Sequence, residues 1–369
     1  MRVLIAPDSF KECLSAHAVA AAIAEGWRDV RPDDDLDLVP IADGGEGTVD
    51  AILAAKRGAR VVVRVTGPLG APVDAVYGLL DEGTAIIEMA SASGLALVPT
   101  AERDPAITTT RGTGELLLHA ARNGATRIVL GIGGSATNDG GAGLVQALSY
   151  RLLDASGTEL PPGGAALAHI ASIEAPATLA LPDITVACDV NNPLCGPNGA
   201  THVYGPQKGA VPRQLAGLDH ALAHFADVVA AHTGHNLRHT PGAGAAGGLG
   251  FALLAFLGAA LRPGIEIIAE ITDLEARIAC ADLVITGEGR VDAQSLMGKV
   301  VGGLIALAER HQKPLTVLAG SLGPGHEQIP AQVIAIGPPG TSAADSIAQA
   351  AEFLRATATR VAFGINCPE

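Results

Sequence analysis

The N-terminal stretch MRVLIAPDSFKE (1–12) places a short apolar run directly before a polar turn. Its segment RVLIAP (2–7) is apolar at nearly every position, which is typical of a strand buried on both faces of a parallel sheet. The same kind of run recurs further along the chain, and strands are therefore expected at LDLVPI (36–41), DLVITG (282–287), PLTVLAG (314–320) and QVIAIG (332–337).

Helices are expected between these strands. Ser15 can cap a first helix that runs to Val30, in which Val19, Ile23 and Trp27 recur at i, i+4 and i+8 and so share one face. Further helices are expected over 46–56, 298–311 and 343–361. Strands alternating with helices in this way predict a flavodoxin- or Rossmann-like, doubly wound parallel sheet.

The middle of the chain has a different pattern. Alternating or hairpin-like segments are expected to form strands at 61–65, 75–80 and 84–89, followed by strands at 127–131 and 184–189 and helices near 112–122, 212–232 and 245–260. We therefore predict a second α/β domain, residues 61–275, inserted into a first domain made of residues 1–60 and 276–369. In an open parallel sheet, ligands bind beyond the carboxyl ends of the strands at the point where the strand order reverses. In a flavodoxin-like order, the loops after the first and third strands, DSFKE (8–12) and GEGRVDAQS (287–295), flank that point.

Length, charge and cysteine content limit the classes of partner and the cellular location that fit this chain. A chain of 369 residues fits two domains, and its net charge of −14 argues against nucleic acid or an anionic membrane as partner. The five cysteines form no C-x-x-C pair, which indicates a reduced, cytoplasmic protein. The N-terminus has no signal-peptide pattern, and the longest apolar stretch (247–261) is shorter than a membrane span.

Four polar, glycine-rich loops directly follow predicted strands. They lie within IADGGEGT (41–48), GIGGSATNDGGAG (131–143), CDVNNPLCG (188–196) and ITGEGRVDAQSLMGK (285–299). Glycines at such turns let backbone amides approach an anion, whereas carboxylates in the same turns suit Mg²⁺ or a hydroxyl proton. Any one of these loops could be ordinary turn chemistry. Together they predict phosphoryl transfer, whose catalysis consists mainly of positioning and charge neutralisation.

Other patterns suggest alternatives. Residues 242–247 match G-x-G-x-x-G and would suit an NAD(P)-dependent oxidoreductase acting on a small hydroxy acid, but no buried strand precedes them. A non-catalytic, nucleotide-responsive binding module is a third possibility. A group of histidines around 220–239 lacks the H-E-x-x-H pattern and is more typical of a solvated helix and loop than of a metal site.

The motifs taken together resemble the type-1 glycerate kinase family, and the resemblance covers essentially the whole chain. The longest matching stretches are APDSFKE (6–12), PIADGGEGT (40–48), GIGGSATNDGGAG (131–143), CDVNNPLCGPNGA (188–200) and DLVITGEGRVDAQSLMGK (282–299). The resemblance implies ATP-dependent phosphorylation of D-glycerate, usually on the 2-hydroxyl to give 2-phosphoglycerate. The residue types leave 3-phosphoglycerate open as the alternative product. The resemblance also implies two α/β domains with the active site in the interdomain cleft, in a monomer or homodimer.

The resemblance also implies a set of site residues. From the first domain these are Asp8, Ser9, Lys11, Asp43, Gly44, Gly45, Glu46, Glu288, Asp292, Gln294 and Lys299. From the inserted domain they are Gly133, Gly134, Ser135, Asn138, Asp139, Asp189, Asn191, Gln207 and Lys208.

Within this set we assign roles as hypotheses. Asp189 accepts the proton of the attacking hydroxyl, and Asp43 and Asp292 hold Mg²⁺ on the phosphates of ATP. Lys299 neutralises charge on the transferred group. A lysine, Lys11 or Lys208, holds the glycerate carboxylate together with backbone amides.

Overall fold

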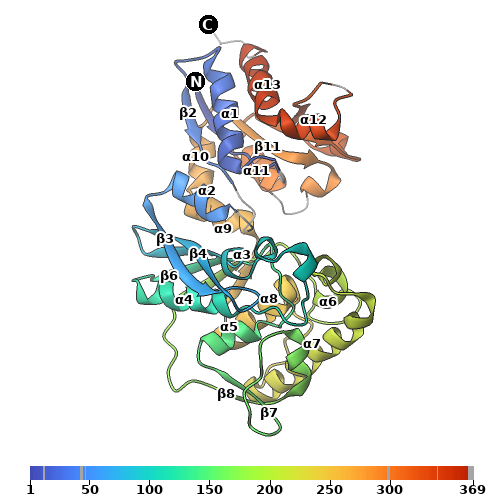
Figure 1. The fold of residues 1–369 in the computed structure, drawn as a ribbon. Coiled ribbons are helices and arrows are strands. Elements are labelled where there is room, and N and C mark those ends of the chain that lie inside the picture. Colours follow the sequence, from blue (N-terminus) through green and yellow to red (C-terminus); the bar gives the residue numbers. More distant parts are fainter. Residues whose placement is uncertain (11–12, 42–44, 46, 297–299, 339, 365–369) are drawn as a thin grey trace. The chain divides into compact units, whose positions relative to one another are not determined.

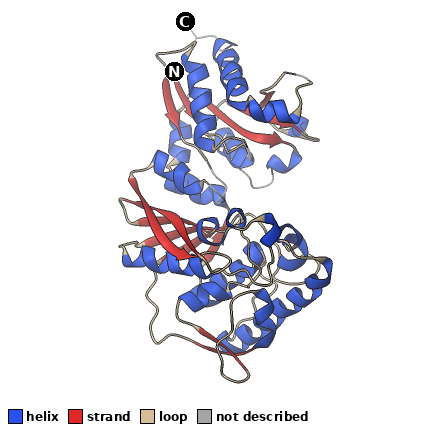
Figure 2. Ribbon diagram, viewed as in Figure 1, coloured by secondary structure: helices blue, strands red, loops and turns tan. Residues whose placement is uncertain are grey.

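The computed structural model describes residues 1–10, 13–41, 45, 47–296, 300–338 and 340–364. The chain is a mixed α/β protein (Figures 1 and 2). It divides into two compact units, of which the first comprises Met1–Asp43, Asp50–Arg57 and Pro263–Glu369, and the second Gly44–Val49 and Gly58–Arg262.

The first unit contains a five-stranded parallel sheet. Its spatial order is β13 (Gln332–Ala335), β12 (Leu315–Leu322), β11 (Leu283–Val291), β1 (Arg2–Ile5) and β2 (Asp35–Leu38). Numbered within this unit alone, the order is 2-1-3-4-5, in which the sequence of strands reverses between β1 and β11. The carboxyl ends of β1 and β11 therefore lie next to each other.

The first helix forms where the sequence predicts it. The Ser15 hydroxyl accepts a hydrogen bond from the Ala18 amide at 3.2 Å and caps α1 (Ala16–Arg28). Val19, Ile23 and Trp27 are buried in one apolar cluster that also contains residues of α13 (Ala350–Gly364). The two helices approach closely, because a Cβ added at Gly26 would lie 2.1 Å from the Arg355 carbonyl oxygen.

The remaining helices of this unit are α2 (Thr48–Ala55), which begins at the unit boundary, α9 (Gly264–Ile271), α10 (Leu274–Cys280), α11 (Val300–Arg310) and α12 (Ala343–Ala348). Helices α9 and α10 pack against α11, and Arg277 of α10 pairs with Asp37 of β2 at 2.5 Å. These contacts place 263–275 in the first unit, whereas the sequence analysis places the boundary after residue 275.

Two elements of the first unit differ from the sequence-based expectation. Strand β11 continues to Val291 instead of ending at Gly287, because Arg290 and Val291 pair in register with Ser321 and Leu322 of β12. The single helix expected over 343–361 is divided into α12 and α13 at Gln349. As a result, Glu288 and Arg290 lie on a strand instead of a loop.

The second unit is built on a six-stranded mixed sheet. Its order is β10 (Ala260–Arg262), β9 (Asp183–Ala187), β6 (Arg127–Gly131), β5 (Thr84–Glu88), β4 (Pro72–Leu80) and β3 (Gly58–Thr66). The pairs β3–β4 and β4–β5 are antiparallel and the others are parallel. Strand β10 and the small hairpin of β7 (Arg151–Asp154) and β8 (Ile170–Glu174) were not expected from the sequence.

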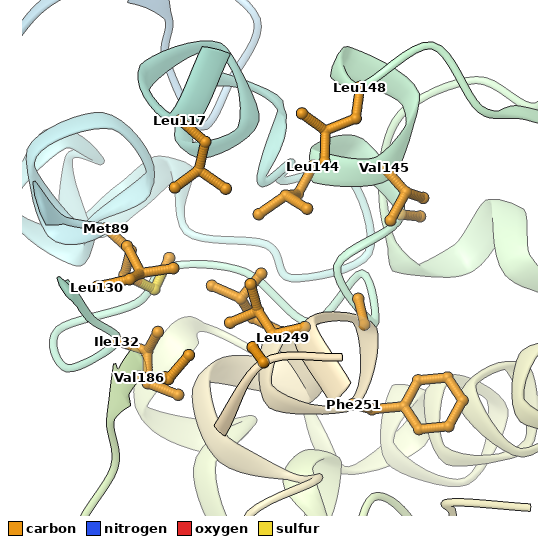
Figure 3. Packing of buried hydrophobic residues seen from close by; sticks show 14 of the residues in the cluster. Met89, Leu117, Leu130, Ile132, Leu144, Val145, Leu148, Val186, Leu249 and Phe251 are labelled. Carbon is orange, nitrogen blue, oxygen red and sulfur yellow. The ribbon is translucent and has the colours of Figure 1, made fainter. Parts of the chain in front are cut away.

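The helices of the second unit are α3 (Ala90–Ser93), α4 (Arg111–Arg122), α5 (Ala142–Ala147), α6 (Ala200–Tyr204), α7 (Pro212–Thr233) and α8 (Ala245–Leu257). Side chains from α4, α5 and α8 and from strands β6 and β9 gather in one apolar core (Figure 3). Ile132, directly after β6, is buried in this core. Burial of Ile132 therefore anchors the start of the polar loop that follows it.

Candidate active site

A cavity of about 1050 Å³ lies at the carboxyl ends of the parallel strands in the first unit. Asp8 and Ser9, which follow β1, line it together with Glu288 of β11 and with Asp292 and Gln294 just beyond that strand. These are the loops that the sequence analysis placed at the switch point. The structure thus brings the described site residues of the first unit into one cavity.

Hydrogen bonds orient the three carboxylates of this cavity. Asp8 Oδ1 accepts from the Ser9 amide at 2.6 Å, and the Asp8 amide donates to the Gly287 carbonyl oxygen at 2.9 Å. The Ser295 hydroxyl donates to Glu288 Oε1. Oδ1 of Asp292 accepts from the Gln294 amide at 2.9 Å, while its Oδ2 lies 3.3 Å from Nε of Arg290.

The rest of the cavity is largely apolar. Phe10, Leu322, Ile336 and Ile347 contribute to its lining. Among its described lining residues, Arg290 is the one lysine or arginine. The cavity therefore combines oxygen ligands, one cation and apolar walls, which suits a ligand with a flat ring and a polar, charged end.

A second polar cluster lies in the loop after β6, in the second unit. Ser135, Asn138 and Asp139 are buried there, and Lys208, at the end of a 3₁₀ turn, reaches the same loop. Lys208 Nζ donates to Ser135 Oγ and to the Thr137 carbonyl oxygen, each at 2.7 Å. Burial lowers the pKa of Lys208 to about 7, and the Asp139 carboxylate partly offsets this shift.

Asp139 holds the loop together. Its Oδ2 accepts from the Thr110 amide and hydroxyl, each at 2.8 Å, and from the Gly143 amide at 3.2 Å. Its Oδ1 accepts from the Gly141 amide at 3.1 Å. Burial raises the pKa of this carboxyl, and the four hydrogen bonds oppose that shift. These contacts show Asp139 bracing two loops from inside the protein.

Two polar atoms beside Lys208 lack a partner among the described residues. They are Oγ1 of Thr137 and Oδ1 of Asn138, both buried. The Asn138 amide group donates instead to Thr201 Oγ1 at 2.9 Å. Such unpaired buried atoms are uncommon in proteins and mark this loop as more than a packing element.

The other predicted residues of the second unit lie at its surface. Asp189 follows β9 and is exposed, as are Asn191 and Gln207. Gly133 and Gly134 are also exposed, and Gly134 has a φ of +72°. The carbonyl oxygen of Gly45 accepts from the Thr48 hydroxyl at 2.8 Å. Five predicted site residues lie outside the described residues, namely Lys11, Asp43, Gly44, Glu46 and Lys299.

Sequence reasoning missed several residues of these clusters. Arg290 stands within the GEGRVDAQ motif but was not assigned a role, and Thr110 lies in a segment without an obvious signal. Arg290 could have been found by asking which cation faces the carboxylates of its own motif. The contact between Thr110 and Asp139 joins residues far apart in the sequence, so only the fold reveals it.

The G-x-G-x-x-G pattern at 242–247 is explained by packing. Residues 246–248 have left-handed backbone angles, and a Cβ added at Gly247 would lie 1.9 Å from the Thr137 carbonyl oxygen. A Cβ at Gly244 would lie 2.2 Å from the Pro193 carbonyl oxygen. These glycines let α8 approach the polar loop, and they provide no support for a dinucleotide site.

Metal and membrane features were also sought in the structure. Within the described residues, no three His, Cys, Asp or Glu side chains are grouped so that they could hold a metal ion. His224 instead contacts the Ile170 carbonyl oxygen at 2.7 Å. The described part of the chain also lacks any helix whose length and apolar character would let it span a bilayer.

Comparison with known proteins identifies the family. The model of the glycerate kinase family matches residues 3–366. The chain is 49% identical over 374 residues to a glycerate kinase of Bacillus subtilis (strain 168), which covers 99% of this chain and 98% of that protein. It is 53% identical over 326 residues to the glycerate 2-kinase of Escherichia coli (strain K12), covering 87% and 86% of the two chains.

A solved structure agrees with these matches. The fold is similar to a crystal structure from Salmonella typhimurium LT2 that is labelled as a glycerate kinase 2, with a TM-score of 0.88 and 50% sequence identity over 98% of this chain and 97% of that one. The chain belongs to the glycerate kinase family and is therefore a kinase, a phosphotransferase that acts on an alcohol group.

Proposed function

We propose that this chain transfers the γ-phosphate of ATP to the 2-hydroxyl of D-glycerate and so forms 2-phosphoglycerate. The observation that carries the proposal is the cavity of about 1050 Å³, whose lining combines three carboxylates, one arginine and apolar side chains. The name of the Escherichia coli relative, glycerate 2-kinase, supports the choice of product.

We assign ATP to the cavity of the first unit. The volume of this cavity is at the upper end of the usual range for small-molecule sites, so a nucleotide fits it. Phe10 and Ile336 offer apolar surface for a base, and Arg290 offers positive charge for phosphate oxygens. We expect the phosphates to lie toward Asp8 and Asp292.

The carboxylates fit Mg²⁺ when it arrives together with the nucleotide. Mg²⁺ is usually held by one or two carboxylates, waters and substrate phosphates and not by a complete protein cage. Asp8, Glu288 and Asp292 offer such oxygen atoms, and we keep Asp43 and Asp292 as the first candidates. When bound, Mg²⁺ would neutralise negative charge on the phosphates.

The chain's own residues would supply the remaining chemistry. Asp189 is the proposed acceptor of the hydroxyl proton, and Lys11 and Lys299 are the proposed counter-charges for substrate oxygens. The loop that holds Ser135 would bind substrate as well. We thus propose that both units described above contribute residues to catalysis.

A direct assay tests the proposal. We expect the purified chain to release ADP from ATP only when D-glycerate and Mg²⁺ are both present, with 3-hydroxypropionate as a control that lacks the 2-hydroxyl. Phosphorus NMR of the product distinguishes 2- from 3-phosphoglycerate. Absence of glycerate-dependent ADP release would contradict the proposed activity, and a 3-phosphoglycerate signal would correct the position of transfer.

A further inference from the structure

Lys208 is one of the largest fully buried side chains in the described part of the protein, with 2% of its surface exposed. Its ammonium group donates to Ser135 Oγ and to the Thr137 carbonyl oxygen. When Lys208 is charged, its ammonium group has no lone pair to accept with, so the Ser135 oxygen acts as the acceptor in this contact. The hydroxyl hydrogen of Ser135 is consequently available for a different partner.

The carbonyl groups of the same loop are directed toward the protein. The Leu95 amide donates to the Gly134 carbonyl oxygen at 2.8 Å, and the Thr108 hydroxyl donates to that of Ala136 at 2.9 Å. Lys208 Nζ donates to the carbonyl oxygen of the next residue, Thr137. These contacts hold the loop at residues 134, 136 and 137.

The amide groups of the loop are left for another partner. Within the described part of the chain, the amides of Gly133, Gly134 and Ser135 donate no hydrogen bond to the backbone. Gly133 and Gly134 are exposed, and Ser135 retains 8% exposure. Exposed amides next to a hydroxyl donor form the kind of turn that binds an anion.

We propose that Lys208 is a positioning residue that fixes Ser135 and the Gly133–Gly134–Ser135 amides as a binding turn for a negatively charged substrate oxygen. This inference rests on the proposed function, and the oxygen belongs either to the carboxylate of glycerate or to a phosphoryl group of ATP. Lys208 acts on that oxygen through Ser135, without direct contact. This role differs from the direct carboxylate contact considered from the sequence.

The burial of the Lys208 charge supports this positioning role over a purely structural role in which Lys208 only holds the loop in place. Removing an ammonium group from water is costly, and a neutral donor would brace two oxygen atoms at lower cost. Burial accordingly lowers the pKa of Lys208, and Asp139 is the charged group that offsets the shift. A buried charge behind an anion-binding turn strengthens the donors in front of it, which explains why the cost is tolerated.

Three variants test the inference, namely Lys208→Met, Ser135→Ala and their combination. Each single variant is expected to lower kcat/KM about 10- to 100-fold, the loss of one charge-assisted hydrogen bond. The double variant is expected to lose little more than either single one, because both remove the same donor. Ser135→Thr keeps the hydroxyl and should retain most of the activity.

Lys56→Met is the matched control, since Lys56 belongs to the first unit and pairs there with Asp273 at 2.6 Å. It should leave kcat/KM within about 2-fold of the wild type. The substrate whose KM rises in Lys208→Met and Ser135→Ala identifies the source of the oxygen. A rise for D-glycerate indicates the carboxylate, and a rise for ATP indicates a phosphoryl group.

Calorimetric binding of D-glycerate and of a non-hydrolysable ATP analogue separates this inference from the proposed function. If the wild type binds a substrate without turning it over, the proposed function fails, while weaker binding in Ser135→Ala and Lys208→Met still supports the turn. Folded Lys208→Met and Ser135→Ala proteins with wild-type binding and kinetics would overturn the inference. Fully additive losses would also overturn it. If Lys208→Met does not fold, the inference is tested by comparing kcat/KM and substrate binding of Ser135→Ala with those of Ser135→Thr.

Discussion

Burying the charge of Lys208 is costly, because it is held away from water with the Asp139 carboxylate as the charged group that offsets the cost. The folded pKa of about 7 lies below the ordinary value of 10.5. Between these two values, the unfolded chain binds more protons at this site than the folded chain does. The contribution of this site to stability therefore rises as the pH rises from about 7 toward 10.5.

This sign predicts the behaviour of Lys208→Met. The quantity to measure, by urea titration, is the free energy of unfolding of the variant minus that of the wild type. This difference should be largest near pH 6 and should decrease toward pH 9.5. The reason is that wild type regains stability as its buried amine loses the proton. A difference between the two proteins that does not change with pH would show that Lys208 has an ordinary pKa.

Asp189 is the residue-scale candidate for the base. Asp189→Asn keeps the size of the side chain but removes its ability to accept a proton. Turnover should fall about 10²- to 10⁴-fold, with little change in melting temperature, because the side chain is exposed. The control is Asp183→Asn, at the exposed start of β9, which should keep wild-type turnover. Retention of most of kcat in Asp189→Asn would exclude it as the base.

At the scale of elements, the important contact is the one between α8 and the loop after β6. Gly247 has a φ of +69° and meets the Thr137 carbonyl oxygen, the same oxygen that accepts from Lys208. Gly258, at the end of the same helix, has a φ of +59° but no neighbour within 4 Å. The two positions thus share their backbone conformation and differ in packing.

Alanine substitutions at Gly247 and Gly258 distinguish the cost of a left-handed backbone from the cost of steric overlap with the loop after β6. Gly258→Ala should cost about 1–2 kcal/mol for a left-handed residue. Gly247→Ala should cost about 1–3 kcal/mol more, because the added methyl displaces the loop, and it should also lower kcat/KM. Chemical unfolding and steady-state kinetics of both variants provide the measurement. Equal effects on stability and activity would show that the loop tolerates the displacement.

At the scale of the whole molecule, the proposed dependence on Mg²⁺ concerns turnover and not folding. The described residues contain no group of three metal-ligating side chains, and we expect folding not to require Mg²⁺. Treatment with EDTA should abolish ADP release, and added Mg²⁺ should restore it. The unfolding midpoint without substrates should stay unchanged, and a large decrease would instead reveal a structural metal.

Asp292→Asn refines this prediction. The variant keeps the hydrogen bond from the Gln294 amide but loses the charge that faces Arg290. If Asp292 holds Mg²⁺, the Mg²⁺ concentration needed for half-maximal turnover should rise about 10-fold or more. Asp33→Asn, at an exposed position before β2 and outside the cavity lining, is the control. An unchanged Mg²⁺ requirement would remove Asp292 from the ligand set.

Much of the architecture could be predicted from local patterns. The apolar runs at β1, β11 and β12 and the stripe of Val19, Ile23 and Trp27 follow from the periodicity of strand and helix alone. The end of β11 could not be predicted, because GEGRV has the composition of a loop and becomes strand only through pairing with β12. The division into α12 and α13 and the strand β10 likewise depend on tertiary contacts.

The sequence by itself determined the α/β class, the family, the loops that carry the polar groups and most of the residue types at the candidate sites. It could do so because strand ends, glycine turns and long motifs are local features of the chain. The interdomain site remains a prediction. Only the tertiary structure showed that Lys208 is buried against Ser135 and that Asp139 joins two loops. Burial and partner distance are set by residues far apart in the chain, and these two quantities decide the charge state and orientation of a side chain.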